Sequence, residues 1–327
     1  MSVCLGCTGV VAERSAASTL GISRRLLRSL VADDVLVRIR RGVLVGACVV
    51  ARARTDPLLD HRIRLEAVLL VYDDCVASHE SAAVVHGLPV LDLPQHVIAT
   101  RVRGAWRGGA DLRVRTAPLP ESHLARVDGC AVTSLARTAV DVARTSSLRA
   151  ALVTGDIALR RCGRAAVQAA LDDSSAWADL GRARRAIALF DGRSESPLES
   201  ASRAIFVEHS LPAPELQVEF KPEPGLAYRA DFFWRSARVI GEADGMGKYE
   251  SPGALRAEPF PLIFAQATTK PGVSRNTPQK VVAKTKISGN GSDVDDLVAL
   301  MAARSARCLR VELLVVAQRG REEGDAD

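Results

Sequence analysis

The stretch from Ser196 to Lys248 constrains the fold of this chain most strongly. It opens with Ser196, Pro197 and Glu199, which read as a helix N-cap, a proline at the first helical position and a glutamate at the third. This spacing predicts a capping box, in which Glu199 reaches back to the backbone N–H of Ser196. Three short strands follow, LQVEF, LAYRADFFW and ARVIGEADG, separated by the turn sequences PEPG and RS. We therefore expect a helix-and-hairpin core.

Three carboxylates fall on the last two of these strands. Asp231 and Glu242 lie on either side of a tight turn, and Asp244 shares a strand face with Glu242 because side chains repeat every second residue. Like charges in one place are tolerated best when a hard divalent cation neutralises them. Such a cluster, holding Mg²⁺ or Mn²⁺, could activate a water for attack on a phosphodiester. Glu199 needs no such role, since helix capping already explains it.

The segments SPLESASR, LPAPELQVEF and YRADFFWRSARVIGEADGMGKY resemble the PD-(D/E)XK nuclease-like domains related to very-short-patch-repair endonucleases. The resemblance implies that Glu199 is the helix acid, Asp231 the strand aspartate and Glu242 the second acid, with Asp231 and Glu242 holding the metal. Asp244 stands where these domains usually carry a lysine. Lys248 is the nearby cation that could substitute for it.

Residues 10 to 46 predict a winged helix-turn-helix. A short helix near Glu13 to Leu20 is followed by a second helix with Ser23 as its N-cap, and the strands VLVRI and GVLVG turn at RG. Valine and isoleucine alternate with arginine along the first strand, as in a half-buried strand. The pattern places six arginines where DNA phosphates could be bound: Arg24, Arg25 and Arg28 on the helix, and Arg38, Arg40 and Arg41 on the wing. The alternative is a basic face that only keeps the protein in solution.

The segments GISRRLLRSLVADDVLVRIRRGVLV, VASHESAAVVHGLP and AVTSLARTAVDVART are similar to the AbiEi-like antitoxin region of actinobacterial proteins that join it to an endonuclease-like domain. This resemblance implies promoter DNA and a nucleotidyltransferase-type toxin as partners. Together the two resemblances span roughly residues 10 to 257. Within the middle segment, His79, Glu80 and His86 are interpreted as helix-packed polar groups, because a heptad spacing of the histidines does not suit one metal ion.

These observations predict an α+β multi-domain protein. We expect a winged-helix part (1–50), an α+β middle region (51–162), a helical connector (163–195), a restriction-endonuclease-like α/β core with an incomplete sheet (196–258) and an atypical tail (259–327). All six lysines lie at or beyond Lys221, and the tail is broken by prolines. We hypothesise that a frameshift or gene-calling artefact replaced the true ending. The alternative is a genuine tail, with a linker over 259–292 and a later helix and strand that complete the sheet.

The compartment is expected to be the cytoplasm. No apolar run reaches eighteen residues, the first residues do not form a signal peptide, and seven scattered cysteines do not suggest a disulfide framework. The formal charge of +6 permits a polyanionic partner but does not require one. Three functions stay open: a Mg²⁺- or Mn²⁺-dependent DNA endonuclease, a winged-helix repressor with a degenerate nuclease fold, and an antitoxin that contacts a toxin protein.

Overall fold

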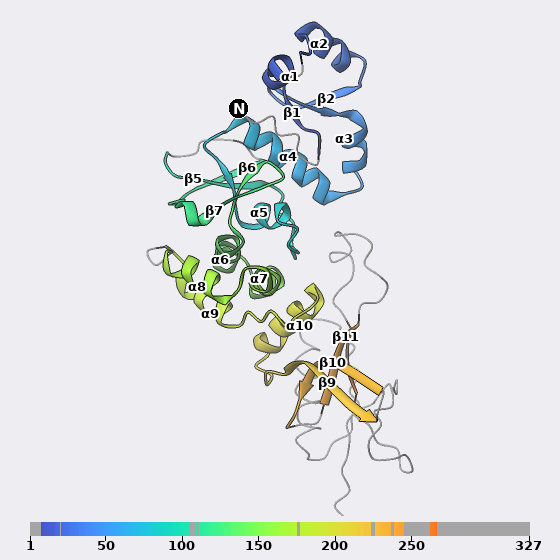
Figure 1. The fold of residues 1–327 in the computed structure, drawn as a ribbon, viewed down its shortest axis with the longest axis vertical. Helices are drawn as coiled ribbons and strands as arrows, with labels where there is room; N and C mark the ends of the chain where they lie inside the picture. The colour runs from blue at the N-terminus through green and yellow to red at the C-terminus, as the bar shows by residue number, and fades with distance from the viewer. Residues whose placement is uncertain are drawn as a thin grey trace, which may run out of the picture. The chain divides into compact units, whose positions relative to one another are not determined.

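The structure is a computed structural model that describes residues 8–19, 21–104, 109, 111–174, 177–223, 226–236, 239–244 and 262–266 (Figure 1). Helices and several separate sheets alternate along the chain, so the predicted α+β class is confirmed. The described residues form two compact units, one ending at Gly192 and one starting at Arg193. None of the helices in these ranges is long and apolar enough to cross a membrane.

The first unit begins with the predicted winged helix-turn-helix. Helices α1 (Glu13–Thr19) and α2 (Arg24–Ala32) precede the hairpin of β2 (Leu36–Arg40) and β3 (Val43–Gly46), and β1 (Val11–Ala12) pairs with β3. The Ser23 side chain accepts a hydrogen bond from the backbone N–H of Leu26, 3.1 Å away, which confirms the predicted cap. Leu27 points inward and contacts a small core with Ala16 and Leu44. Both helices and the wing thus lie where the sequence pattern predicts them.

A five-stranded sheet follows, in the order β6-β5-β4-β8-β7. It is built from β4 (Val76–Ala77), β5 (Val97–Arg101), β6 (Leu112–Thr116), β7 (Leu124–Val127) and β8 (Cys130–Thr133), and the pairs β5–β6 and β4–β8 are parallel. Helices α3 (Ala47–Ala53), α4 (Pro57–Val71) and α5 (His79–Val85) and the short turn η1 (Glu121–His123) complete this part. Apolar side chains of α4, α5 and the sheet form one buried core.

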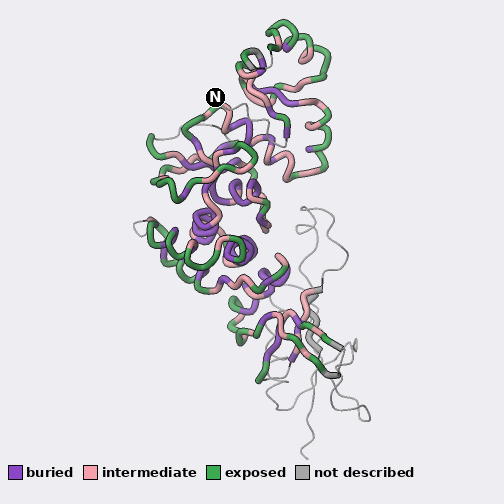
Figure 2. Tube along the Cα trace, viewed as in Figure 1, coloured by how far each residue is buried: buried purple, intermediate pink, exposed green. Residues whose placement is uncertain are grey.

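Four helices end the first unit: α6 (Leu135–Thr145), α7 (Leu148–Cys162), α8 (Arg164–Asp172) and α9 (Leu180–Ala188). The α6 helix starts at Leu135 with Ser134 as its N-cap, and it is buried along almost all of its length (Figure 2). It contacts α5 as well as α7, α8 and α9. These helices therefore pack on the middle region and form one unit with it.

The described residues of the second unit form a four-stranded antiparallel sheet with one helix. Its order is β12-β11-β10-β9, from β9 (Glu215–Glu223), β10 (Leu226–Trp234), β11 (Val239–Asp244) and β12 (Leu262–Gln266). Helix α10 (Pro197–Glu208) packs on the sheet through Phe206, whose ring centroid lies 5.2 Å from those of both Phe232 and Trp234.

Strand β12 departs from the sequence-based expectation of a linker over 259–292. The segment LIFAQ is apolar and suits a strand, and it pairs with the otherwise open edge of β11. Residues 267–327, to which the frameshift hypothesis mainly applies, lie outside the described residues.

Candidate functional site

The first predicted site residue, Glu199, lies in the first turn of α10 and is 6% exposed. Its backbone N–H donates to the Ser196 hydroxyl over 3.1 Å, which confirms the N-cap. Its carboxylate, however, accepts from the backbone N–H of Glu195 (2.8 Å) and from the Ser196 hydroxyl (2.7 Å). The predicted bond to the backbone N–H of Ser196 is thus replaced by one to the preceding residue. Two donors at the helix start hold this carboxylate in place.

A side chain that the sequence pattern does not single out joins Glu199 to Asp231. The Nε2 atom of Gln217, on β9, donates to Glu199 Oε2 (2.9 Å) and to Asp231 Oδ1 (3.2 Å). Gln217 faces Asp231 across the β9–β10 pair, because its neighbours Leu216 and Val218 are in register with Phe232 and Ala230. A helix, a middle strand and an edge strand thus bring two carboxylates to one amide.

The second predicted acid, Glu242, lies opposite Asp231 on the adjacent strand. Because Phe232 is in register with Gly241 in this antiparallel pair, the neighbouring residues Asp231 and Glu242 face each other across β10 and β11. Asp231 Oδ2 accepts the backbone N–H of Ala243 over 2.9 Å, so its second oxygen is used by the backbone of β11. Asp244 pairs with Leu262 in the ladder, but its side chain and all of Lys248 lie outside the described residues.

The described acids offer few oxygens to Mg²⁺ or Mn²⁺. Among the side chains that the structure describes, no group of three or more His, Cys, Asp or Glu could hold a metal ion. Glu199 and Asp231 approach each other, but the facing oxygen of each accepts from Gln217 Nε2. Burial raises the pKa of Glu199, its hydrogen bonds oppose the rise, and the charge of Asp231 adds to it. The described donors therefore do not fit a divalent-cation centre as they stand.

The predicted DNA-binding helix presents its arginines to solvent. Arg24, Arg25 and Arg28 are all exposed on α2, while Leu27 between them is buried. Within the described part of the chain, none of the three makes an ion pair; Arg28 Nε donates only to the backbone carbonyl of Arg24, at 3.4 Å. Their guanidinium groups are therefore available for an anionic partner.

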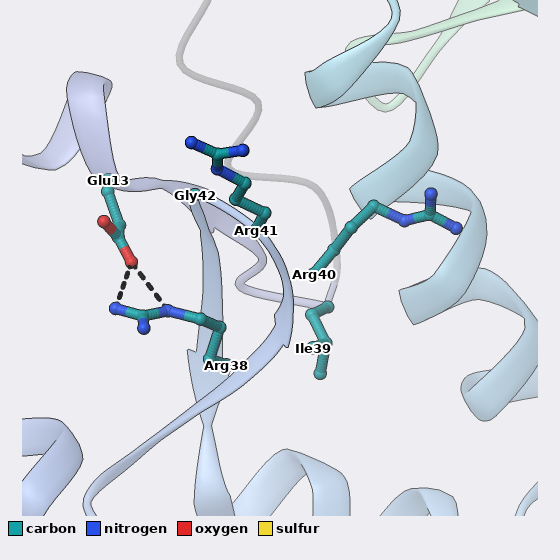
Figure 3. Close-up of a pocket in the computed structure, with 6 residues that line it drawn as sticks. All are labelled: Glu13, Arg38, Ile39, Arg40, Arg41 and Gly42. Carbon is teal, nitrogen blue, oxygen red and sulfur yellow. Dashed lines mark hydrogen bonds and ion pairs between the residues drawn. The ribbon is translucent and has the colours of Figure 1, made fainter.

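The predicted wing arginines are not equivalent. Arg38 pairs with Glu13 of α1, through Nε (3.0 Å) and Nη2 (2.7 Å), whereas Arg40 pairs with Asp111. A register shift between Arg38 and Arg40 breaks the two-residue alternation, and Figure 3 shows the two side chains pointing to different sides of the hairpin. Arg41 is exposed at the turn beside Gly42, whose φ of +77° suits glycine. Of the wing residues, Arg41 is thus the cation best placed for a phosphate.

The first unit also holds a buried polar network that the sequence pattern does not reveal. Arg137 of α6 is 1% exposed, and its Nη1 donates to the carbonyl of Pro118 (3.1 Å) and contacts His123 Nδ1 (3.0 Å). Its guanidinium lies 3.9 Å above the ring of Trp177. Because an arginine only donates, His123 Nδ1 is the acceptor, which fits a neutral ring. The network ties η1 to the helices and has a structural role.

His79 lies in the same buried region at the start of α5. Its backbone φ is +54°, and its Nδ1 lies 3.0 Å from the Ser78 hydroxyl and 3.9 Å from Asp141. Burial, followed by the positive charge of Arg115, lowers the pKa of His79 to about 3. His86 Nε2 instead bonds the Thr133 carbonyl at 2.7 Å. The two histidines thus have separate partners.

No model of a known protein family matches the chain. Two uncharacterized proteins of Mycobacterium tuberculosis, MT2308 of strain CDC 1551 / Oshkosh and Rv2248 of strain ATCC 25618 / H37Rv, are each 35% identical to it over 136 residues. The match covers 41% of this chain and 50% of each relative, so the chain spans about half the length of the curated relatives it matches. Their names assign no activity.

Proposed function

We propose that this is a DNA-binding protein of the toxin–antitoxin or defence type. The observation that carries the proposal is the set of solvent-facing guanidinium groups on α2, with a further one, Arg41, at the wing turn. A helix and an adjacent hairpin can contact phosphates on both sides of a groove. Contacts of this kind release counterions and supply most of the non-specific affinity.

Fluorescence anisotropy with a labelled duplex, measured over a series of salt concentrations, tests this proposal. The triple variant R24A/R25A/R28A should bind more weakly, and the slope of log K against log salt should become shallower by about 0.9 for each phosphate that the variant no longer neutralises. A matched control is R182A/R184A/R185A, which removes the same charge from exposed positions of α9. If both triple variants change the slope equally, net charge is responsible and α2 is not the binding surface.

The second candidate function is cleavage of DNA by the endonuclease-like unit. It is favoured by the position of Asp231 opposite Glu242 on the neighbouring strand. In this candidate Asp231 and Glu242 are the metal-binding acids, with Glu199, Asp244 and Lys248 in support, and the cofactor is Mg²⁺ or Mn²⁺.

Plasmid nicking separates the two candidates. The purified protein is incubated with supercoiled plasmid and Mg²⁺ or Mn²⁺, beside the variants D231A and E242A. Nicking by the wild type that is absent from both variants supports the endonuclease. Equal nicking by all three proteins excludes it, because a contaminating nuclease does not depend on these acids.

An antitoxin role is a more specific form of the first candidate. It follows from the resemblance of the winged-helix and middle segments, and it predicts promoter DNA and a nucleotidyltransferase-type toxin as partners in the cytoplasm. A neighbouring nucleotidyltransferase gene and protection of the operon's own promoter in a footprint would support it. Footprinting without promoter preference would leave only non-specific DNA binding.

A further inference from the structure

The Gln217 carboxamide occupies the space between two carboxylates. Both hydrogens of its Nε2 are used, one toward Glu199 Oε2 at 2.9 Å and one toward Asp231 Oδ1 at 3.2 Å. Its Oε1 is buried and has no hydrogen-bond partner among the described residues. The amide is therefore oriented by the two acids alone, with its donor end toward them.

The remaining oxygens of this pair are also engaged. Glu199 Oε1 accepts from the Ser196 hydroxyl, and Glu199 Oε2 accepts additionally from the Glu195 backbone. Asp231 Oδ2 accepts from the Ala243 backbone. Each carboxylate thus turns toward the other only the oxygen that Gln217 binds.

The backbone of Gln217 supports the same conclusion. Its φ is +54°, in the left-handed region that non-glycine residues rarely adopt. The residues on both sides keep the β9–β10 register, so the unusual conformation is confined to this one position of the strand. Local strain of this kind persists where the surroundings hold a residue in place, and the side chain of Gln217 is held by hydrogen bonds to both acids.

We propose that the Gln217 amide substitutes for a divalent cation between Glu199 and Asp231 and so closes the pair to metal ions. The inference takes the identity of the site from the second candidate function, and it argues against metal binding between these two acids in the wild-type protein. An NH₂ group with two hydrogens can bridge two carboxylates, as a cation would. It supplies only partial charge, however, and an entering ion must first displace it. The pair in this chain is thus held together without a metal.

The variant Gln217→Glu tests the proposal, because it replaces the NH₂ group by an oxygen of nearly the same shape. Three carboxylates then meet, which is unfavourable without a cation and favourable with one. We expect isothermal titration of the full-length protein with Mn²⁺ to show one site in Q217E, at least tenfold tighter than any site in the wild type. The melting temperature of Q217E should rise with Mn²⁺, and that of the wild type should not.

Gln168 of α8 provides a matched control. Its Nε2 donates to Asp172 at 2.8 Å on an exposed helix face, so Q168E makes the same chemical change beside another carboxylate. It should not gain a comparable Mn²⁺ site. If Q217E does not fold with or without Mn²⁺, the variant Gln217→Met is measured in its place, because it removes the NH₂ donor and keeps the length of the side chain. Q217M should bind Mn²⁺ more tightly than the wild type but less tightly than a three-carboxylate site would.

Two results overturn the proposal. The first is a wild-type Mn²⁺ site that Asp231→Asn abolishes and Q217E does not strengthen. The second is a folded Q217E and a folded Q217M that both bind Mn²⁺ no better than the wild type. This test measures Mn²⁺ binding and not DNA cleavage. An absence of plasmid nicking would therefore exclude the endonuclease candidate without contradicting the proposal that Gln217 substitutes for a cation.

Discussion

Arg137 and Asp141 form an ion pair one helical turn apart on α6, with 2.9 Å between Nε and Oδ2, and their side chains are 1% and 0% exposed. Asp141 also approaches Arg144 at 3.4 Å. Removing one partner of such a pair leaves a charge inside the protein without compensation, which typically costs about 3–5 kcal/mol. The pair therefore holds α6 in its place at the centre of the first unit.

Asp141→Ala should accordingly destabilise the protein by roughly 3–5 kcal/mol in urea unfolding. The control is Asp60→Ala, which breaks the more exposed pair of Asp60 with Arg64 on α4 and should cost about 0–1 kcal/mol. Comparable destabilisation of the two variants would show that burial does not increase the contribution of the Arg137–Asp141 pair to the free energy of unfolding.

The close approach of Gly155 and Phe190 gives a second prediction. Gly155 lies in the middle of α7, and a Cβ built there would overlap the ring of Phe190, which is 2% exposed. Gly155→Ala should therefore destabilise the protein by about 1–3 kcal/mol, although alanine favours helices over glycine by about 1 kcal/mol.

The double variant G155A/F190A tests the cause of that destabilisation. Truncating Phe190 removes the overlap, so the double variant should be more stable than the sum of the two single changes predicts. Additive effects would mean that the glycine is required for another reason, such as the backbone of α7.

Acid sensitivity follows from the buried histidines. His61 of α4 is buried, its Nε2 lies 2.9 Å from the Ser81 hydroxyl, and burial, followed by the charge of Arg64, lowers its pKa from 6.5 to about 4. Below pH 6.5 His61 becomes protonated in the unfolded chain but stays neutral in the folded protein. The free energy of unfolding therefore falls as the pH drops from 6.5 toward 4. The shift corresponds to about 1 kcal/mol or more for each pH unit within this window.

The free energy of unfolding should therefore be lower at pH 5 than at pH 7. His61→Gln should reduce the difference between the free energies of unfolding at pH 7 and pH 5, because one group that takes up a proton on unfolding is removed. His79, whose pKa is lowered to about 3, continues to lower the stability at acidic pH. An unchanged pH dependence in H61Q would show that His61 does not titrate in this way.

Local signals in the sequence are sufficient to predict many elements. Ser23 and Ser196 cap their helices as predicted, because a cap depends on residues only three positions apart. The wing turn at Arg41 and Gly42 is predictable for the same reason. The two-residue strand β4 has no such pattern, and its place between β5 and β8 depends on parallel pairing with a distant segment.

The candidate site is predictable only in part. The tight turn between the last two predicted strands indicates that Asp231 and Glu242 lie on neighbouring strands, and the β10–β11 register places them opposite each other. Gln217 is neutral and does not stand out among candidate metal ligands, and its proximity to Asp231 requires the β9–β10 register. In the same way, Arg40 and Asp111 are 71 positions apart, and no local rule relates them.

The pairing of Arg38 with Glu13 leads to the last prediction. Glu13 neutralises a wing arginine that would otherwise face an anionic partner (Figure 3). Glu13→Gln should free Arg38, raise the affinity for duplex DNA and steepen its salt dependence by about 0.9 for one added phosphate contact. Removing any acid weakens the repulsion of DNA, so Glu121→Gln, at an exposed position of η1, serves as the charge-matched control. Adding Arg38→Ala to E13Q should cancel the gain in DNA affinity, whereas R38A alone should have little effect on affinity. If R38A instead weakens DNA binding equally in the wild type and in E13Q, Arg38 binds DNA despite its ion pair, and Glu13 does not restrain it.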